Sequence, residues 1–332
     1  MIRNMIFLIV VFGLTIWGVF RGENLGQILF FLGQMNKWYL IPSILCVVIF
    51  IFGESIIIWY MLRTVGIRMK VARCYLYSFV GFFVSCITPS ASGGQPAQIY
   101  YMKRDKIPVP VSTLILMIVT ITYKLVLVII GVGILVWRPA GVMQLLEPVL
   151  FWCYLGIGLN IFAVTSMFIL VFHPTLASRC MLLIVRIMEK LHILREKEGR
   201  LARWHNHMEE YHAAAAYFKE NKMVVVNVLA ITMVQRLILF FVTYLVCLAF
   251  GLHQYSWVVI MLGQAMISVS VDMLPLPGGM GISETLFLSI FSPVFGKLTL
   301  PAMVVSRGIS YYAQLLISAV MTVVAHFRIK GD

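Results

Sequence analysis

The chain has 332 residues, of which 61% are hydrophobic and only 12% are charged. Soluble domains contain about 45–50% apolar and about 25% charged residues, so this composition excludes an ordinary soluble domain and indicates a polytopic membrane protein. The formal net charge of +13 is typical of lysine and arginine in loops that face anionic lipid. We therefore expect an anionic membrane surface as a partner, and no nucleic acid.

Cysteine usage indicates neither a disulfide framework nor a metal centre. The six cysteines are scattered through apolar runs, without a CxxC pair or a Cys/His pairing of zinc-binding spacing. No GxGxxG, Walker or GxSxG pattern occurs either. We therefore expect no metal, no cofactor and no catalytic residue.

Apolar runs predict the transmembrane helices in chain order. About 20 apolar residues are needed to cross a bilayer as a helix. The segment 24–36 is short and amphipathic, so we expect it at the membrane surface. The first apolar run, residues 4–20, resembles a signal peptide. No small-residue cleavage site follows it, so we expect a helix that is retained in the protein. Six full spans are predicted, at residues 4–20, 38–62, 109–137, 148–172, 223–250 and 299–326.

Two further apolar stretches, 74–102 and 256–295, are interrupted by proline and glycine at "TPSASGGQP" and "LPLPGGMGISE". Arginine and lysine lie on both sides of the first stretch, so both of its flanks should be cytoplasmic and the stretch should be a re-entrant hairpin. The second stretch has only Lys297 on its flanks. Because the neighbouring basic segments belong inside, this hairpin should enter from outside, with both chain termini cytoplasmic.

The two halves of the chain then have the same order of elements in opposite orientations. Residues 38–137 run as span, hairpin and span, and residues 223–326 repeat this order inverted. Transporters built this way bind substrate between the repeats near the membrane midplane. We therefore predict an all-α, multi-pass protein of the cell membrane, with residues 1–332 as one membrane domain of inverted repeats.

The polar region 173–222 should connect the two repeats on the cytoplasmic side. Its first part is amphipathic and basic, which suits a helix on the anionic leaflet. His205, His207 and His212 with Glu209 and Glu210 have helical spacings that metal ligands also use. The pattern lacks HExxH, and a solvated helix explains it.

The interruptions carry the candidate substrate-binding residues. The second helix of each hairpin should begin at Gly94 and at Gly279, where free N–H groups favour an anion. Lys124 lies 30 residues after Gly94, and Arg307 lies 28 residues after Gly279. Charges at membrane depth are costly unless they are paired or hydrated, which points to a phosphate site. The predicted substrate-binding residues are Lys124, Arg307, Glu54, Arg236, Ser90, Gly93, Gly94, Gln95, Gln98, Asp272, Gly278, Gly279 and Glu284.

The acidic residues leave alternatives open. Glu54, Asp272 and Glu284 could neutralise the bases, bind a cationic headgroup, or serve only to lock helices together. Glu284 lies near the start of a helix, where a carboxylate also stabilises the first turn.

At "TPSASGGQPAQIYYMKR" and "LPLPGGMGISETLF" the chain resembles the lysylphosphatidylglycerol synthase transmembrane-region family. This is the flippase-like membrane domain of the bacterial multiple peptide resistance factor, which also occurs as stand-alone proteins. The resemblance covers about residues 5–326. It implies two re-entrant hairpins and translocation of an aminoacylated phospholipid or a related lipid, with a link to antibiotic resistance.

The last span is followed only by "FRIKGD", so we expect the stand-alone form, without the soluble aminoacyl-transfer domain of the full-length factor. Translocation of a phospholipid or a polyprenyl-phosphate-type lipid is then the favoured function. The alternatives are a phosphatidylglycerol lysyltransferase-type enzyme and a membrane partner of a separate lipid synthase. A homodimer is also possible on this sequence.

Overall fold

The long helices form the frame of the protein. The computed structural model describes residues 25–172 and 215–329, and within these ranges every regular element is a helix. Five helical stretches are long and apolar enough to cross a membrane. They contain α3 (Leu40–Thr64), α6 (Val109–Trp137), α8 (Leu150–Phe172), α11 (Lys222–Ala249), and the run of α14 (Thr299–Arg307), η6 (Gly308–Ala313) and α15 (Gln314–Arg328).

These stretches confirm the all-α polytopic fold and five of the six predicted spans. The remaining predicted span, 4–20, lies outside the described residues, as do residues 173–214 of the connector with its histidines. The last span differs from the prediction in one respect, because its middle, η6, is a π-helix. Short π-helical turns inside α-helices frequently mark functional sites.

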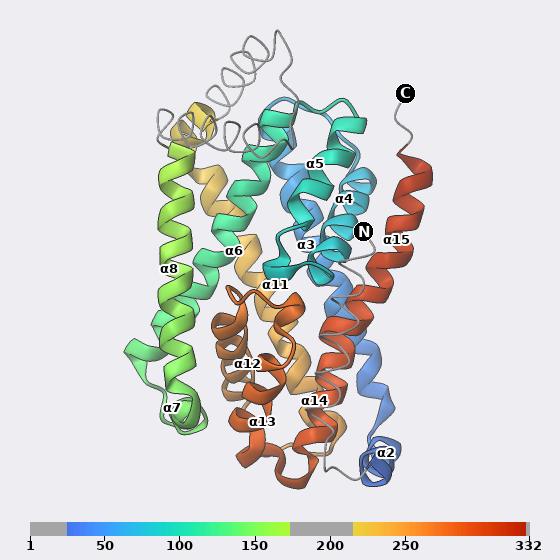
Figure 1. Ribbon diagram of the computed structural model, residues 1–332, viewed down its shortest axis with the longest axis vertical. Coiled ribbons are helices and arrows are strands. Elements are labelled where there is room, and N and C mark those ends of the chain that lie inside the picture. Colours follow the sequence, from blue (N-terminus) through green and yellow to red (C-terminus); the bar gives the residue numbers. More distant parts are fainter. Residues whose placement is uncertain (1–24, 173–214, 330–332) are drawn as a thin grey trace, which may run out of the picture.

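Both interrupted stretches form helical hairpins. The first consists of α4 (Val71–Cys86), the 3-10 turn η2 (Pro89–Ala91) and α5 (Gly94–Arg104). The second consists of α12 (Trp257–Val271), the 3-10 turn η4 (Pro277–Gly279) and α13 (Ile282–Phe295). The hairpins occupy opposite halves of the molecule, and their tips, η2 and η4, pack against each other (Figure 1).

The prediction that the second hairpin's returning helix begins at Gly279 was wrong. The helix α13 begins at Ile282, because Gly278, Gly279 and Gly281 all have positive φ angles between 58° and 86°. A right-handed helix cannot continue through such residues, whereas glycine tolerates them. In the first hairpin, α5 does begin at Gly94.

Helix packing within the two halves follows the same pattern. In the first half, α3 packs on α4, α4 on α5, and α6 on both α5 and α3. In the second half, α11 packs on α12, α12 on α13, and α14 on both α13 and α11. Between the halves, α4 packs on α15 just as α12 packs on α6, and α3 packs along α11. Equivalent pairs of helices are therefore in contact in both halves of the chain.

Two large apolar clusters fill most of the interior, and the long helices α3, α6 and α11 each pass from one of these clusters to the other. On α3, Val47, Phe50 and Ile51 belong to one cluster, and Ile57, Ile58, Met61 and Leu62 belong to the other. Charged residues lie at these crossing points: Glu54 on α3, Lys124 on α6 and Arg236 on α11. A polar layer therefore lies between the two apolar halves, close to the middle of each helix.

The remaining elements lie at the periphery. The helix α2 (Leu25–Gln34) exposes Leu29 and Phe30 and contacts α14, as expected for an amphipathic surface helix. The helix α7 (Ala140–Leu146), which the sequence analysis did not predict, packs against α12 and α13. The short 3-10 turns are η1 (Lys37–Tyr39), η3 (Glu147–Val149) and η5 (Gly296–Leu298).

Candidate functional site

A cavity of about 430 Å³ lies where the hairpin tips meet the long helices. This volume falls within the range of roughly 300–1,000 Å³ that is usual for small-molecule sites. It is large enough for a polar headgroup and too small for that headgroup together with long acyl chains. Its charged lining residues are Glu54, Lys124, Arg236, Asp272 and Arg307, and its uncharged polar lining includes Ser85, Gln95, Gln98, Thr120, Tyr123, Thr243, Gln264, Ser268, Ser310, Tyr311 and Gln314.

Lys124 forms an ion pair that joins the two halves of the chain. Its Nζ donates to Asp272 Oδ2 at 2.6 Å, from the middle of α6 to the end of α12. Both side chains are largely buried, at 14% and 13% exposure. The charge of Lys124 is therefore already balanced by a carboxylate of the opposite hairpin.

Arg307 is also neutralised. Its Nε donates to Glu284 Oε1 at 2.8 Å, and its Nη2 donates to the carbonyl oxygen of Gly278 at 2.9 Å. The guanidinium also lies over the ring of Tyr311, 4.8 Å from the ring centroid. Arg307 thus fixes the loop of the second hairpin to the π-helical segment of the last span.

Glu284 closes the N-terminus of α13. Its Oε2 accepts hydrogen bonds from the Gly281 backbone N–H at 2.7 Å and from the Ser283 hydroxyl at 2.9 Å. A carboxylate here satisfies a free N–H group and interacts favourably with the helix dipole. The end of α13 that was predicted to hold an anion is therefore already occupied by a carboxylate of the protein.

Arg236 differs from the other two cations. It is 3% exposed, and it forms no ion pair among the described residues. Its Nε and Nη2 are buried without a hydrogen-bond partner. The guanidinium lies over Tyr123, 3.2 Å from the ring centroid, and 5.2 Å from the centroid of Phe50. Leaving buried donors unsatisfied costs about 1–3 kcal/mol each, and more when the group is charged.

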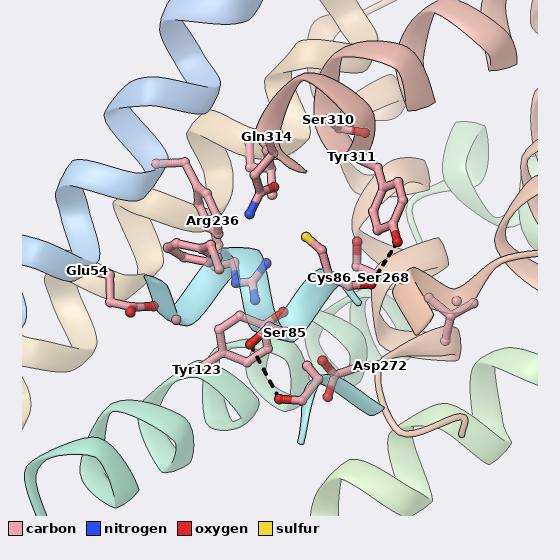
Figure 2. A pocket seen from close by; sticks show the side chains of 18 of the residues that line it. Glu54, Ser85, Cys86, Tyr123, Arg236, Ser268, Asp272, Ser310, Tyr311 and Gln314 are labelled. Carbon is pink, nitrogen blue, oxygen red and sulfur yellow. Dashed lines mark hydrogen bonds between the residues drawn. The ribbon is translucent and has the colours of Figure 1, made fainter. Parts of the chain in front are cut away.

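Glu54 faces the same cavity from α3. Its Oε1 accepts a hydrogen bond from Gln98 Nε2 at 2.6 Å, so the first hairpin's helix α5 orients the carboxylate. The helices α3 and α11 cross closely here, because a Cβ at Gly53 would lie 2.8 Å from Gln235 Cγ. Gln235 Nε2 also donates to the Phe50 carbonyl oxygen at 2.7 Å. The close crossing places Glu54 and Arg236 at the same level of the cavity (Figure 2).

The glycines at the two tips have different roles. In the first hairpin, a Cβ at Gly94 would lie 2.0 Å from Ser85 Oγ, so this glycine allows α4 and α5 to pack closely. Gly93 donates its N–H to Thr88 Oγ1 at 3.0 Å. In the second hairpin, Gly278 and Gly279 line the cavity itself. The glycines of the second tip therefore border the cavity, where Gly278 also packs closely against Tyr311, whereas those of the first tip pack only inside their own hairpin.

The structure brings most of the predicted site residues together. Three of them do not line the cavity: Gly93 and Gly94 pack inside the first hairpin, and Glu284 caps α13 behind Arg307. A fourth, Ser90, has a side chain outside the described part of the structure. Nine predicted residues line it: Glu54, Gln95, Gln98, Lys124, Arg236, Asp272, Gly278, Gly279 and Arg307.

Several lining residues were missed by the sequence analysis, although helical spacing could have found some of them. Tyr311 and Gln314 lie four and seven residues after Arg307, on the same helix face. Thr243 lies seven residues after Arg236. Tyr123 had no such signal, because its contact with Arg236 joins different helices.

Metal ligands do not cluster in this cavity. Within the described ranges, no group of three or more His, Cys, Asp or Glu side chains is arranged to hold a metal ion. The lining instead combines charged groups with amides and hydroxyls, which suits a polar organic group that carries charge.

The fold and the cavity define the class: a polytopic helical membrane protein in which two facing hairpins enclose a polar, headgroup-sized cavity. Within that class, the chain matches the sequence model of the family described as "Lysylphosphatidylglycerol synthase TM region" over residues 5–318, and it belongs to this family. Its function is accordingly related to membrane lipids. A comparison with curated proteins finds no match.

Proposed function

We propose that this protein translocates a phosphate-containing lipid, such as an aminoacyl-phosphatidylglycerol, across the cell membrane. The polar headgroup would cross through the cavity between the two hairpins while the acyl chains stay in the bilayer. The observation that carries the proposal is the polar cavity at mid-height, enclosed by hairpins that reach it from opposite ends. Non-helical backbone at membrane depth is tolerated where it lines such a cavity.

Two further features support translocation. The equivalent helix contacts in both halves of the chain support an inverted repeat, the architecture in which alternating access proceeds by rocking one repeat against the other. At the cavity, two polar contacts join the halves of the chain: the Lys124–Asp272 ion pair and the hydrogen bond from Tyr311 to the Cys86 carbonyl at 2.8 Å. Such contacts can break and reform with the opening of one side.

Lipid translocation by the purified protein in vesicles tests the proposal. The chain is reconstituted with a headgroup-labelled phospholipid, and a membrane-impermeant quencher reports the lipid that has reached the outer leaflet. We expect the wild type to move lipid and Ser268→Trp to reduce the rate at least about tenfold, because the indole fills the cavity. Val258→Trp lies on the same helix, α12, at a half-exposed position and should transport normally.

Two results would count against translocation. Equal rates in empty vesicles and in vesicles with protein would exclude it, and so would full activity of Ser268→Trp in a folded protein. If the purified chain instead formed lysylphosphatidylglycerol from phosphatidylglycerol and lysyl-tRNA, the transferase alternative would replace the proposal.

A further inference from the structure

Among the described residues, three cationic side chains line the cavity. Two of them form ion pairs with carboxylates, and the third does not. Lys124 is bound to Asp272 and Arg307 to Glu284, each at less than 3 Å. Arg236 forms no ion pair, and two of its guanidinium nitrogens are buried without a hydrogen-bond partner. Since Arg236 lines the cavity at 3% exposure, it is the cation there whose charge no carboxylate among the described residues pairs with.

The geometry around Arg236 holds the guanidinium ready for a ligand. Stacking on Tyr123, with a distance of 3.2 Å to the ring centroid, covers one face of its plane. A phosphate binds arginine along the edge of that plane through two parallel N–H···O bonds, so the stacking does not compete with it. Figure 2 shows the guanidinium directed into the cavity between Tyr123 and Gln314.

Gln314 provides a second free donor from the last span. Its side chain is 7% exposed and lines the cavity. None of the described residues donates to or accepts from its amide, whereas Gln98 is bonded to Glu54 and Gln264 accepts from Thr243. Its amide group is thus available for a further phosphate oxygen or for a hydroxyl of the headgroup.

Glu54 sets a limit on the charge of that ligand. It faces the same cavity as Arg236, and within the described part of the chain only its Oε1 accepts a hydrogen bond, from Gln98. A second negative charge on the ligand would meet this carboxylate without a further unpaired cation to balance it. Like charges at short range repel strongly where water is excluded.

We propose that Arg236 is the phosphate ligand of the cavity, and that Glu54 restricts it to a singly charged phosphodiester headgroup over a doubly charged phosphomonoester. Lys124 and Arg307 hold the hairpins and contribute no direct phosphate contact. This inference rests on the proposed lipid translocation for the role of the bound lipid. Binding of the phosphate by Arg236 is tested independently of transport.

The test measures binding of two lipids that differ by one ethyl ester on the phosphate and therefore in its charge. Dioleoyl phosphatidylethanol is a diester with one negative charge, and dioleoyl phosphatidic acid is a monoester that is almost doubly charged at pH 8. Native mass spectrometry of the purified full chain gives their apparent affinities, with dioleoylglycerol as the phosphate-free reference. We expect the wild type to prefer the diester, and dioleoylglycerol to bind weakly.

Substitutions then assign the roles. We expect Arg236→Gln to weaken binding of the diester about ten- to a hundredfold, as for loss of a charge-assisted bidentate contact. Glu54→Gln should preserve diester binding and raise the affinity for the monoester to a similar level. A role of Arg236 in structure alone is separated by thermal unfolding: Arg236→Gln should not lower the Tm, because it removes an unpaired buried charge.

Each outcome decides the inference. Diester binding by Arg236→Gln at the wild-type level, a lowered Tm with unchanged affinity, or monoester preference by the wild type would overturn it. If Arg236→Gln loses binding but the wild type moves no lipid in vesicles, the phosphate site stands and the translocation proposal fails. If the wild type transports lipid and Arg236→Gln still binds it fully, translocation stands and this inference fails.

Discussion

At the scale of single residues, the second hairpin depends on a backbone conformation that only glycine adopts easily. Gly278 has a φ angle of 58°, and a Cβ there would lie 2.1 Å from the ring of Tyr311. Its carbonyl oxygen accepts the hydrogen bond from Arg307. The residue therefore combines a conformational requirement with close contact to a ring that lines the cavity.

This combination predicts that alanine substitutions at two glycines reduce the free energy of unfolding by different amounts. Gly278→Ala should destabilise the protein by about 2–4 kcal/mol, because strain at positive φ adds to displacement of the Tyr311 ring. Gly281→Ala is the matched control: its φ angle is 86°, but a Cβ there meets nothing within 4 Å. It should cost less, about 1–2 kcal/mol, from backbone strain alone. Denaturation of both variants in detergent measures the difference, and equal losses would contradict the steric explanation.

At the scale of elements, the last span is joined to the tip of the first hairpin, which belongs to the opposite half of the chain. The Tyr311 hydroxyl, on the π-helical segment η6, donates to the Cys86 carbonyl oxygen at the end of α4. Cys86, Met280 and Tyr311 form a small apolar cluster of their own around it. The last span is thereby attached to the first hairpin at the point where the hairpin tips, η2 and η4, border the cavity.

Loss of this hydrogen bond should loosen the tips without unfolding the protein. Tyr311→Phe keeps the ring and leaves the Cys86 carbonyl unsatisfied, at a cost of about 1–2 kcal/mol. We expect faster alkylation of the buried Cys86 thiol by a small maleimide, in protein whose other cysteines are serine. The same cysteine variant with Tyr311 intact is the control. An unchanged alkylation rate for Tyr311→Phe would show that the bond does not hold the tips together.

At the scale of the whole molecule, the hairpins enter from opposite ends, so their outer loops belong on opposite sides of the bilayer. The base of the first hairpin lies near Lys70 and Lys103, and the base of the second near His253 and Lys297, all exposed. Because its flanks are positively charged, we propose that the base of the first hairpin lies on the cytoplasmic side.

A map of single cysteines checks this orientation. In a variant without native cysteines, Lys70→Cys and Lys103→Cys should be protected from an impermeant maleimide in intact cells. His253→Cys and Lys297→Cys should be labelled. All four should react after the membrane is permeabilised, which controls for local accessibility. Opposite labelling of the two cysteines that flank one hairpin would show that this stretch crosses the membrane completely.

How far the fold and site could be predicted varies with the kind of interaction. The spans, both interruptions and the charged residues at mid-helix are encoded in local hydrophobicity and in proline and glycine positions, because a bilayer requires long apolar helices and penalises isolated charges. The start of α13 was misplaced by three residues, since positive φ angles at a run of glycines are not visible in composition.

The sequence by itself therefore determined the all-helical membrane fold, the two hairpins and a set of charges at membrane depth. Only the tertiary structure decided which charges are paired: Lys124 meets Asp272 across 148 positions of the chain, Arg307 meets Glu284, and Arg236 is left against the ring of Tyr123. The reason is physical. The desolvation free energy of a charged side chain at membrane depth follows from its position in the sequence. The partners that offset this free energy come within hydrogen-bonding distance only when the helices pack together.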